Sequence, residues 1–577
     1  MIILGLNILH GDSSACLIKN GTLISAVEEE RFTRIKHYSN FPQNSISYCL
    51  NKSKINIEDV DYVTINTNWK YNLFYKLLFL IKNIFNLNFV SNRAEKINGR
   101  LKIKKKLEKI YQKKIKAKFV FVPHHLSHAY STMFFNKENK CSLIFSFDGS
   151  GDFSTIESYS VKDNKIKLIK KNIFPHSLGL FYSAFTQFLG FNNFGDEYKF
   201  MGLAGYGKPI YYEKIKLLIK SLTPFRLDMT YFNLPRMDYS KKFPQSNNFF
   251  HEKFDLYFKD IYQNNNAFHD NQINKDIAAS VQKVFEEIVI ENLNNLTKKV
   301  SFDSLYLTGG CAFNSLLVGK IIKTKKFKNV YVDTNPGDAG GAVGSAFYLL
   351  NKKGFKINKI QQTQFLGPSY SNEEIKKKVI DKIKNNKNFN ITYYDNFEEL
   401  SFKSAQIIFH KNIIFWFQGA MEWGPRSLGN RSILANPAAK NIKDFINQKI
   451  KKREKFRPFA PSVMEEFSDE YFEMMGQKSP NMNIVFNAKK ITLDHLPEII
   501  HADNTSRVQT VSKKNNNRFY SLIENFRKIS NFPILINTSM NIDAPIVLSP
   551  NDAFETFLKA DVEDLVLNNW HIQKKYN

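Results

Sequence analysis

Short apolar runs that end in turns rich in Gly, Asp and Asn recur along this chain of 577 residues. In the first half the same plan occurs twice. An apolar run at 2–7, an acidic turn and two further runs extend to residue 27, and the runs at 143–147, 156–161 and 166–169 repeat it. Such runs are typical of strands. The repetition predicts a duplicated α/β domain, with turns that hold phosphates or a metal between two lobes.

Two later segments run from an apolar strand through paired glycines into a helix. The strand at 304–308 leads into Gly309 and Gly310, and a second strand near 331 is followed by Gly340 and Gly341. Helix N-termini fed by glycines bind anions well. Glycines also allow a strand and a helix to pack closely, so the sequence leaves both interpretations open.

A histidine pair points to metal chemistry. His124 and His128 are four residues apart, so on a helix both rings lie on one face and can share a cation. Acidic turns follow at Asp148 and Asp338. Two imidazoles and a carboxylate suit Fe(II) or another divalent ion, which would act as a Lewis acid. His10, in the first turn, is either a general base or a structural turn residue.

Turn residues at 351–371 predict a domain boundary, and a charged helix at 373–385 follows it. Beyond it, an apolar strand at 413–417 leads into the first of two Gly- and Pro-rich loops, 419–434 and 451–461. These loops hold the cations Arg426, Arg431, Lys451, Arg453 and Arg457. Arginines held in rigid turns suit phosphate and carboxylate oxygens. The plainer interpretation is a salt-bridged surface loop.

The formal net charge is +28, which would fit a nucleic-acid or membrane partner. Lysine is scattered along the whole chain, however, so we attribute the charge to composition bias, except in a predicted basic helix at 93–118. The most apolar stretch, 71–90, is interrupted by Lys and Asn and predicts a buried or interfacial helix without stable membrane insertion. Four widely spaced cysteines and an N-terminus unlike a signal peptide predict a cytoplasmic protein.

Together the motifs resemble the O-carbamoyltransferases of the NodU, cephamycin and tobramycin carbamoyltransferase family. The resemblance covers nearly the whole chain. In the first half it rests on Asn-Ile-Leu-His-Gly-Asp-Ser-Ser-Ala (7–15), Glu-Glu-Glu-Arg-Phe (28–32), His-His-Leu-Ser-His-Ala (124–129), Asp-Glu-Tyr-Lys-Phe-Met-Gly-Leu-Ala (196–204), Thr-Gly-Gly-Cys-Ala-Phe-Asn (308–314) and Gly-Asp-Ala-Gly-Gly (337–341). In the second half it adds the Gly-Pro-Arg, Arg-Glu-Lys-Phe-Arg-Pro-Phe-Ala-Pro and Asn-Thr-Ser segments.

The resemblance implies a duplicated actin-like ATPase domain over 1–355, similar to tRNA threonylcarbamoyl-transferase proteins, and a YrdC-like α/β domain over 365–577. It implies that the second domain makes carbamoyl adenylate from carbamoyl phosphate and ATP. The first domain then transfers the carbamoyl group to a hydroxyl of a small-molecule or sugar acceptor. ATP with Mg²⁺, a divalent metal such as Fe(II), and a homodimer complete this expectation.

Roles of individual residues are also implied by the resemblance. The metal ligands are His124, His128 and Asp338, with Asp148 as a fourth, and His10 takes the proton of the acceptor. The adenylate contacts are Gly309, Gly310 and Asn314, and Lys199 contacts phosphate or the acceptor. A phosphate clamp consists of Arg426, Arg431, Lys451, Arg453 and Arg507, completed by Asn537 and Ser539.

The chain departs from the family pattern at Met540, where Phe is usual, in a shortened loop at 541–547, and at Gly205, which replaces a common Pro. Two other functions stay open. One is a tRNA threonylcarbamoyl-transfer enzyme, which the basic charge favours, and the other is a non-catalytic nucleotide- or RNA-binding protein. The fused second domain favours carbamoyl phosphate chemistry, with no nucleic-acid partner. The segment 211–275, rich in Phe, Tyr and Asn, is predicted to set acceptor specificity or to form a partner surface.

Overall fold

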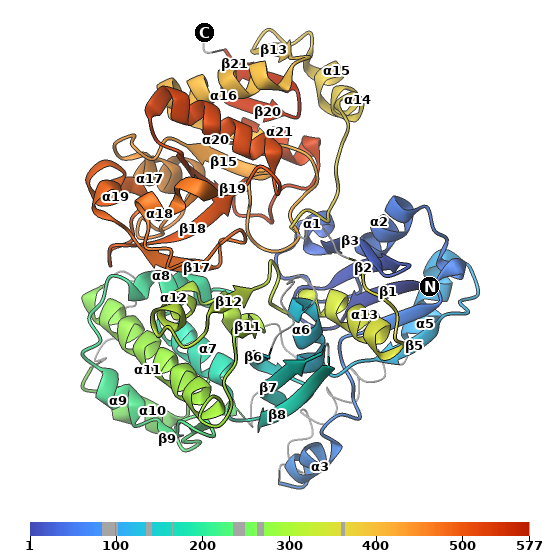
Figure 1. Ribbon diagram of the computed structural model, residues 1–577, viewed down its shortest axis with the longest axis vertical. Coiled ribbons are helices and arrows are strands. Elements are labelled where there is room, and N and C mark those ends of the chain that lie inside the picture. The colour runs from blue at the N-terminus through green and yellow to red at the C-terminus, as the bar shows by residue number, and fades with distance from the viewer. Residues whose placement is uncertain are drawn as a thin grey trace. The chain divides into compact units, whose positions relative to one another are not determined.

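The computed structural model describes residues 1–82, 99, 102–133, 141–163, 165–234, 249–261, 271–358 and 364–575. The chain forms two compact units (Figure 1). Unit 1 comprises Met1–Ile24 and Ser39–Lys359, and unit 2 comprises Ser25–Tyr38 and Ile360–Asn577. The assignment of Ser25–Tyr38 to unit 2 was not expected from the sequence, because this segment lies within the predicted first domain.

Unit 1 is built on two five-stranded sheets with the same topology. The first has the strand order β3 (Thr22–Glu28), β2 (Ser14–Lys19), β1 (Ile2–Asn7), β4 (Tyr62–Ile65) and β5 (Lys118–Phe121). The second has the order β8 (Lys165–Ile173), β7 (Ser154–Lys162), β6 (Ser142–Gly151), β11 (Ser304–Thr308) and β12 (Asn329–Val332). In each sheet the first strand along the chain pairs antiparallel with the second and parallel with a later one. The predicted duplication and the actin-like class are confirmed.

Helices connect and cover these sheets. They are α2 (Gln43–Ser53), α3 (Leu73–Lys82), α5 (Ile103–Tyr111), α6 (His124–Met133), α7 (Leu178–Phe188), α8 (Glu197–Ala204), α9 (Tyr212–Lys216), α10 (Glu252–Phe258), α11 (Gln272–Leu296), α12 (Ser315–Lys323) and α13 (Gly340–Lys352). Helix α6 packs closely against α13, because a Cβ at Gly344 would lie 1.7 Å from the carbonyl oxygen of Ser127. This contact brings the histidines of α6 close to the turn that precedes α13.

Two sequence expectations in unit 1 are refined by the structure. The helix predicted at 71–90 as buried or interfacial is α3 in its described part, where most of its apolar side chains are exposed, so of these two alternatives the interfacial helix stays a prediction. The basic helix predicted at 93–118 ends at Tyr111, and Lys118 already belongs to β5. Residues 83–98, 100 and 101 of these two segments, and 235–248 and 262–270 of the predicted specificity segment, lie outside the described residues.

Unit 2 contains a nine-stranded mixed sheet. Its strand order is β13 (Phe389–Tyr393), β21 (Trp570–Lys574), β20 (Asp564–Leu567), β14 (Ile413–Phe417), β15 (Arg431–Ala435), β19 (Ile534–Ser539), β16 (Ala460–Met464), β18 (Thr505–Val511) and β17 (Ile484–Asn487). The predicted helix at 373–385 is helical from Asn372 to Ile383. The α/β class expected for the second domain is thereby confirmed, and its YrdC-like character stays a prediction.

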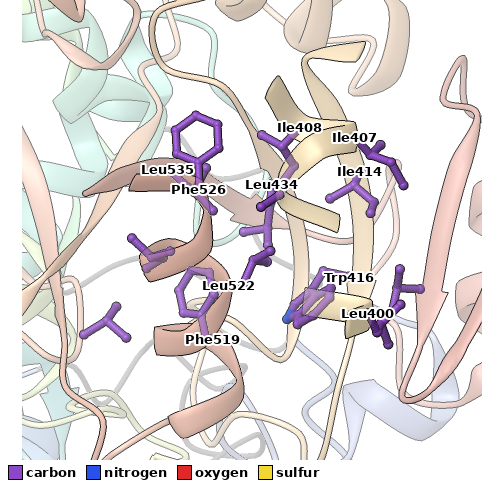
Figure 2. Close-up of a cluster of buried hydrophobic side chains, with 14 of the residues drawn as sticks. Leu400, Ile407, Ile408, Ile414, Trp416, Leu434, Phe519, Leu522, Phe526 and Leu535 are labelled. Atoms are coloured by element: carbon purple, nitrogen blue, oxygen red, sulfur yellow. The ribbon is translucent and has the colours of Figure 1, made fainter. Parts of the chain in front are cut away.

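Two helices of unit 2 share one core with the sheet. Helices α16 (Phe397–Lys411) and α20 (Asn517–Ser530) contribute Leu400, Ile408, Leu522 and Phe526 to a cluster of buried side chains that includes the fully enclosed Trp416 of β14 (Figure 2). This burial fixes β14 and therefore the start of the loop that follows it. That loop carries the Gly-Pro-Arg motif.

Candidate functional site

Four side chains of unit 1 converge on one point. His124 and His128 come from α6, Asp148 from β6, and Asp338 from the turn before α13. The two Nε2 atoms lie 3.1 Å apart, and each lies 3.3–3.8 Å from an oxygen of both carboxylates. Ligands held about 2.1 Å from one divalent cation are separated by roughly 3.0–3.4 Å. The four groups therefore fit a single cation.

The turn between β6 and β7 also holds one ligand in place. Asp152 Oδ2 accepts hydrogen bonds from the backbone N–H groups of His124 (2.9 Å) and Asn68 (2.7 Å), and its Oδ1 accepts from the Thr67 hydroxyl (2.6 Å). Gly151 leaves room for the imidazole, because a Cβ there would lie 1.9 Å from His124 Cδ2. Asp152 thus fixes the start of α6. The sequence placed it in an acidic turn but gave it no role.

The carboxylates and imidazoles of this cluster shift one another's pKa values. Burial alone would raise the pKa of Asp148, but hydrogen bonds from His124 and His128 hold it well below its usual value. Burial likewise opposes ionisation of Asp338, but its interactions with His10 and His128 together outweigh this effect and lower its pKa. For His128, burial lowers the pKa, whereas hydrogen bonds to both carboxylates raise it to about 9. Without a metal, the protein therefore holds a proton where the metal would bind.

His10 lies at the metal-ligand cluster and is not an isolated turn residue. Its Nδ1 is 3.0 Å from Asp338 Oδ2, and its ring stacks on that of His124 with 4.9 Å between centroids. The His125 ring points away from the cluster, and its Nδ1 lies 2.8 Å from the Ser146 hydroxyl. Burial lowers the pKa of His125 to about 3, so this ring stays neutral. His10 therefore lies beside the cluster, and its role as a base stays a prediction.

Close packing accounts for the paired glycines in both loops. Gly309 has a φ of +90°, and a Cβ there would lie 2.2 Å from the Phe147 carbonyl oxygen. The N–H of Gly310 donates to Asp148 (2.9 Å), which orients that carboxylate. A Cβ at Gly341 would lie 2.3 Å from the amide nitrogen of Asn66. Of the two interpretations left open, the structure supports close packing.

Two further residues predicted to contact the nucleotide have partners within the fold. Asn314 caps α12 through the Leu317 N–H (3.0 Å) and exchanges amide hydrogen bonds with Gln282 at 3.0 and 2.9 Å. The Lys199 ammonium lies 2.8 Å from Asp196. Their predicted contacts with adenylate, phosphate or acceptor stay predictions.

A group of mutually repelling cations lies in unit 2. Burial lowers the pKa of Arg507 well below its usual value, and the positive charges of Arg426 and Arg453 lower it further. Burial also lowers the pKa of Lys451, and Arg453 and Lys36 add to that effect. The Nε of Arg507 is buried and has no hydrogen-bond partner within the described part of the chain. Cations held together in this way are stabilised by an anion with several oxygens.

The end of β19 supports these cations. The Lys451 ammonium donates to the carbonyl oxygen (3.0 Å) and to Oδ1 (2.8 Å) of Asn541, and it also contacts the Ser539 carbonyl. The Asn537 amide donates to the carbonyl oxygen of Ser427 at 3.2 Å, which links β19 to the Gly-Pro-Arg loop. The loops at 419–434 and 451–461 and strand β19 therefore meet at one site, with Arg507 contributed by β18.

Comparison with known proteins identifies the family. Residues 2–347 match the family described as Carbamoyltransferase N-terminus, and residues 405–574 match Carbamoyltransferase C-terminus. The chain belongs to the carbamoyltransferase family. An uncharacterized protein of Synechocystis sp. is 35% identical, over 99% of this chain and 96% of that protein. The nodulation protein NolNO of Sinorhizobium fredii is 32% identical, over 99% of this chain and 80% of its own.

Resemblance to solved structures is much weaker. Component A of (R)-2-hydroxyglutaryl-CoA dehydratase from Acidaminococcus fermentans aligns with a TM-score of 0.36 and 14% identity, over 61% of this chain and 99% of its own. The family assignment therefore rests on sequence, and it makes this protein an enzyme, a carbamoyltransferase. Within the described residues, no helix of the carbamoyltransferase combines the length and apolar character needed to cross a bilayer.

Arg431 supports the loop of the carbamoyltransferase from within. Its side chain is fully enclosed and stacks over the Phe417 ring, with 3.6 Å from Cζ to the centroid. Its terminal nitrogens donate to the carbonyl oxygens of Gln418 (2.6 Å), Pro368 (3.0 Å), Asn430 (3.1 Å) and Gly419 (3.1 Å). Because these donors are committed to backbone carbonyls, we leave Arg431 out of the clamp proposed below.

Glu422 organises the same loop and was not singled out from the sequence. Its Oε1 accepts hydrogen bonds from the backbone N–H groups of Leu428 (2.9 Å), Asn430 (2.8 Å) and Arg431 (3.1 Å). A buried carboxylate surrounded by glycines is the signal that points to such a role, since it needs several donors to remain ionised.

The segment Ser25–Tyr38 ties into unit 2 through two arginines. Arg31 donates to the Gly424 carbonyl (2.9 Å), directly before the Pro-Arg of the motif. Arg34 donates to the carbonyl oxygens of Pro545 and Ile546, both at 2.6 Å, in the loop that is shorter than the family pattern. The Glu-Glu-Glu-Arg-Phe motif is therefore partly a structural element of unit 2.

A cation at the histidine–aspartate cluster must displace the proton of His128. Since the pKa of this ring is about 9, it is protonated at neutral pH, and cation affinity should rise with pH up to about 9. We expect an increase of about tenfold per pH unit for one displaced proton. Titration of the metal-free protein with Co²⁺ at several pH values, followed by visible absorption, measures this slope. An affinity independent of pH between 6.5 and about 8.5 would contradict the assignment.

A matched pair of variants tests whether the hydrogen bonds of Glu422 stabilise the loop. Glu422→Ala leaves three buried N–H groups without their acceptor, and we expect a loss of about 3 kcal/mol in the free energy of unfolding. Glu422→Gln retains an acceptor oxygen, so it should lose less than half as much. Tryptophan fluorescence in urea reports on unit 2, which holds Trp416, Trp423 and Trp570 of the four tryptophans. Equal losses in both variants would argue against the hydrogen bonds as the cause.

Proposed function

We propose that this carbamoyltransferase works in two steps at two centres. The first step forms carbamoyl adenylate from carbamoyl phosphate and ATP at the cation group of unit 2. The second transfers the carbamoyl group to a hydroxyl of a small-molecule or sugar acceptor at the histidine–aspartate cluster of unit 1. The observation that carries the proposal is the group of mutually repelling cations formed by Arg426, Arg453, Arg507 and Lys451, of which Lys451 is buried and the three arginines are half-buried.

The first step brings two polyanions together. Carbamoyl phosphate and the ATP triphosphate repel one another, and the arginine forks of Arg426, Arg453 and Arg507 offset this repulsion through charge-assisted hydrogen bonds. Mg²⁺ is expected to accompany ATP. Asn537 and Ser539, on β19, line the same site and complete the clamp.

In the first step, one bond of carbamoyl phosphate and one bond of ATP break in succession. Reaction of carbamoyl phosphate with water releases phosphate and leaves carbamate. A carbamate oxygen then attacks the α-phosphorus of ATP, and the bond to pyrophosphate breaks. The products are carbamoyl adenylate, pyrophosphate and phosphate.

In the second step His10 accepts the proton of the acceptor hydroxyl while the oxygen attacks the carbamoyl carbon and AMP leaves. The Asp338 carboxylate, 3.0 Å from the His10 ring, stabilises the imidazolium that forms. His124, His128, Asp148 and Asp338 would hold a divalent cation, and two imidazoles with two carboxylates suit Fe(II). When bound, the cation supplies Lewis-acid polarisation of the carbonyl.

The first half of this scheme is tested by isotope exchange. The purified protein, supplied with carbamoyl phosphate, should incorporate labelled pyrophosphate into ATP. Exchange without carbamoyl phosphate, or none with intact protein, would contradict adenylate formation. Salt-sensitive binding of tRNA, together with no exchange, would favour threonylcarbamoyl transfer or RNA binding instead.

The division of labour is tested by two variants. Arg453→Ala should abolish pyrophosphate exchange, because it removes a cation from the clamp. His124→Ala should retain exchange and lose carbamoyl transfer to a hydroxyl acceptor, by about a hundredfold or more. Lys455→Ala removes a solvent-exposed cation from the same loop and serves as the matched control. If both test variants fail at the same step, the two-centre scheme is wrong.

A further inference from the structure

Helix α3 presents an apolar face to solvent. Its exposed side chains are Leu73, Phe74, Leu77, Leu78 and Ile81, which we call the α3 face. Phe74 is 66% exposed and Ile81 70%, values that are unusual for large apolar residues placed side by side on one short helix. In Figure 1, α3 lies at the margin of unit 1 beyond β8.

The orientation of the helix is set by its opposite side. Phe79 is buried and its ring contacts those of Phe153 and Phe174, at 5.2 and 5.6 Å between centroids. This anchor belongs to the core of unit 1. The α3 face therefore points away from a fixed attachment, and its exposure is not a consequence of a loosely attached helix.

Lysines and amphipathic aromatic rings surround the start of α3. The Lys171 ammonium lies 5.3 Å from the ring centroids of both Tyr71 and Tyr75. Lys70 lies 5.2 Å from the Trp69 ring. No acidic residue occurs between positions 62 and 82 or along β8. The neighbouring Glu157 accepts a hydrogen bond from the Tyr71 hydroxyl (3.1 Å) but is fully buried, so the exposed charges of these two segments are basic. Apolar side chains flanked by Trp, Tyr and Lys are the composition of interfacial membrane anchors.

The charge pattern selects one occupant of the α3 face. A second copy of this chain would bring the same lysines against one another, because a symmetric contact repeats the same surface on both sides. The surface of an anionic bilayer offers negative headgroups to the lysines and hydrocarbon to the apolar side chains. In its described part, α3 spans ten residues, and its exposed apolar side chains can enter the boundary between headgroups and acyl chains.

We propose that the α3 face docks this enzyme reversibly on the surface of an anionic lipid bilayer. The proposal is independent of the two-step mechanism, because no residue of the α3 face belongs to either centre. Docking would bring the enzyme to acceptors that reside at a membrane surface.

Vesicle sedimentation of the full chain tests this proposal. The protein should sediment with vesicles containing about 30% phosphatidylglycerol in phosphatidylcholine, and less in higher salt, because the lysine contribution is screened. The double variant Phe74→Ser/Ile81→Ser should lower the partition coefficient at least about tenfold. Leu217→Ser/Leu256→Ser removes two leucines of unit 1 that are 71% and 72% exposed and lie outside the α3 face, and it should bind as the unmodified protein does.

Far-UV circular dichroism and the midpoint of thermal unfolding of each double variant verify that the protein is folded, and both should match those of the unmodified protein. Three results would overturn the proposal. The first is no sedimentation of the unmodified protein with anionic vesicles in low salt. The second is an equal loss in both double variants. The third is self-association that the Phe74→Ser/Ile81→Ser variant abolishes while vesicle binding is absent, which would assign the α3 face to a second copy.

Discussion

Helices α6 and α13 pack so closely that a Cβ at Gly344 would overlap the carbonyl oxygen of Ser127. The unit 1 centre depends on this contact, because α6 carries two imidazoles and the turn before α13 carries Asp338. Two halves of a duplicated fold are thereby joined around one point. These ligand groups lose little conformational entropy when they bind a cation, because packing already fixes their geometry.

The two centres solve opposite electrostatic problems. In unit 1, two carboxylates are neutralised by imidazoles, and a proton remains on His128 that a metal would replace. In unit 2, Lys451 is held by backbone carbonyls and by Asn541, and the repulsion between the cations is left for a ligand to relieve. Each arrangement favours a ligand of the opposite charge, and in each the buried surroundings strengthen that preference.

Several charged residues of the unit 2 centre hold the backbone of the Gly-Pro-Arg loop in place. Glu422 holds three N–H groups of the Gly-Pro-Arg loop, and Arg431 holds four of the surrounding carbonyls. Arg31 reaches the same loop from a segment remote in sequence. The half-buried Arg426 lies in a turn that the buried side chains of Glu422 and Arg431 organise through hydrogen bonds to the backbone. Arginines in the Gly- and Pro-rich loops can therefore have a structural role, as Arg431 does, as well as a ligand-binding one.

The sequence by itself determined the duplicated strand pattern, the strand at 413–417 and the pairing of His124 with His128, because these depend on local periodicity. The resemblance to a family added Asp148 and Asp338 as partners. Only the tertiary structure decided that Arg431 faces backbone carbonyls, that Asp152 holds the start of α6, and that Ser25–Tyr38 belongs to unit 2. These outcomes depend on contacts between residues distant in the chain, and local residue patterns carry no information about which distant group a side chain meets.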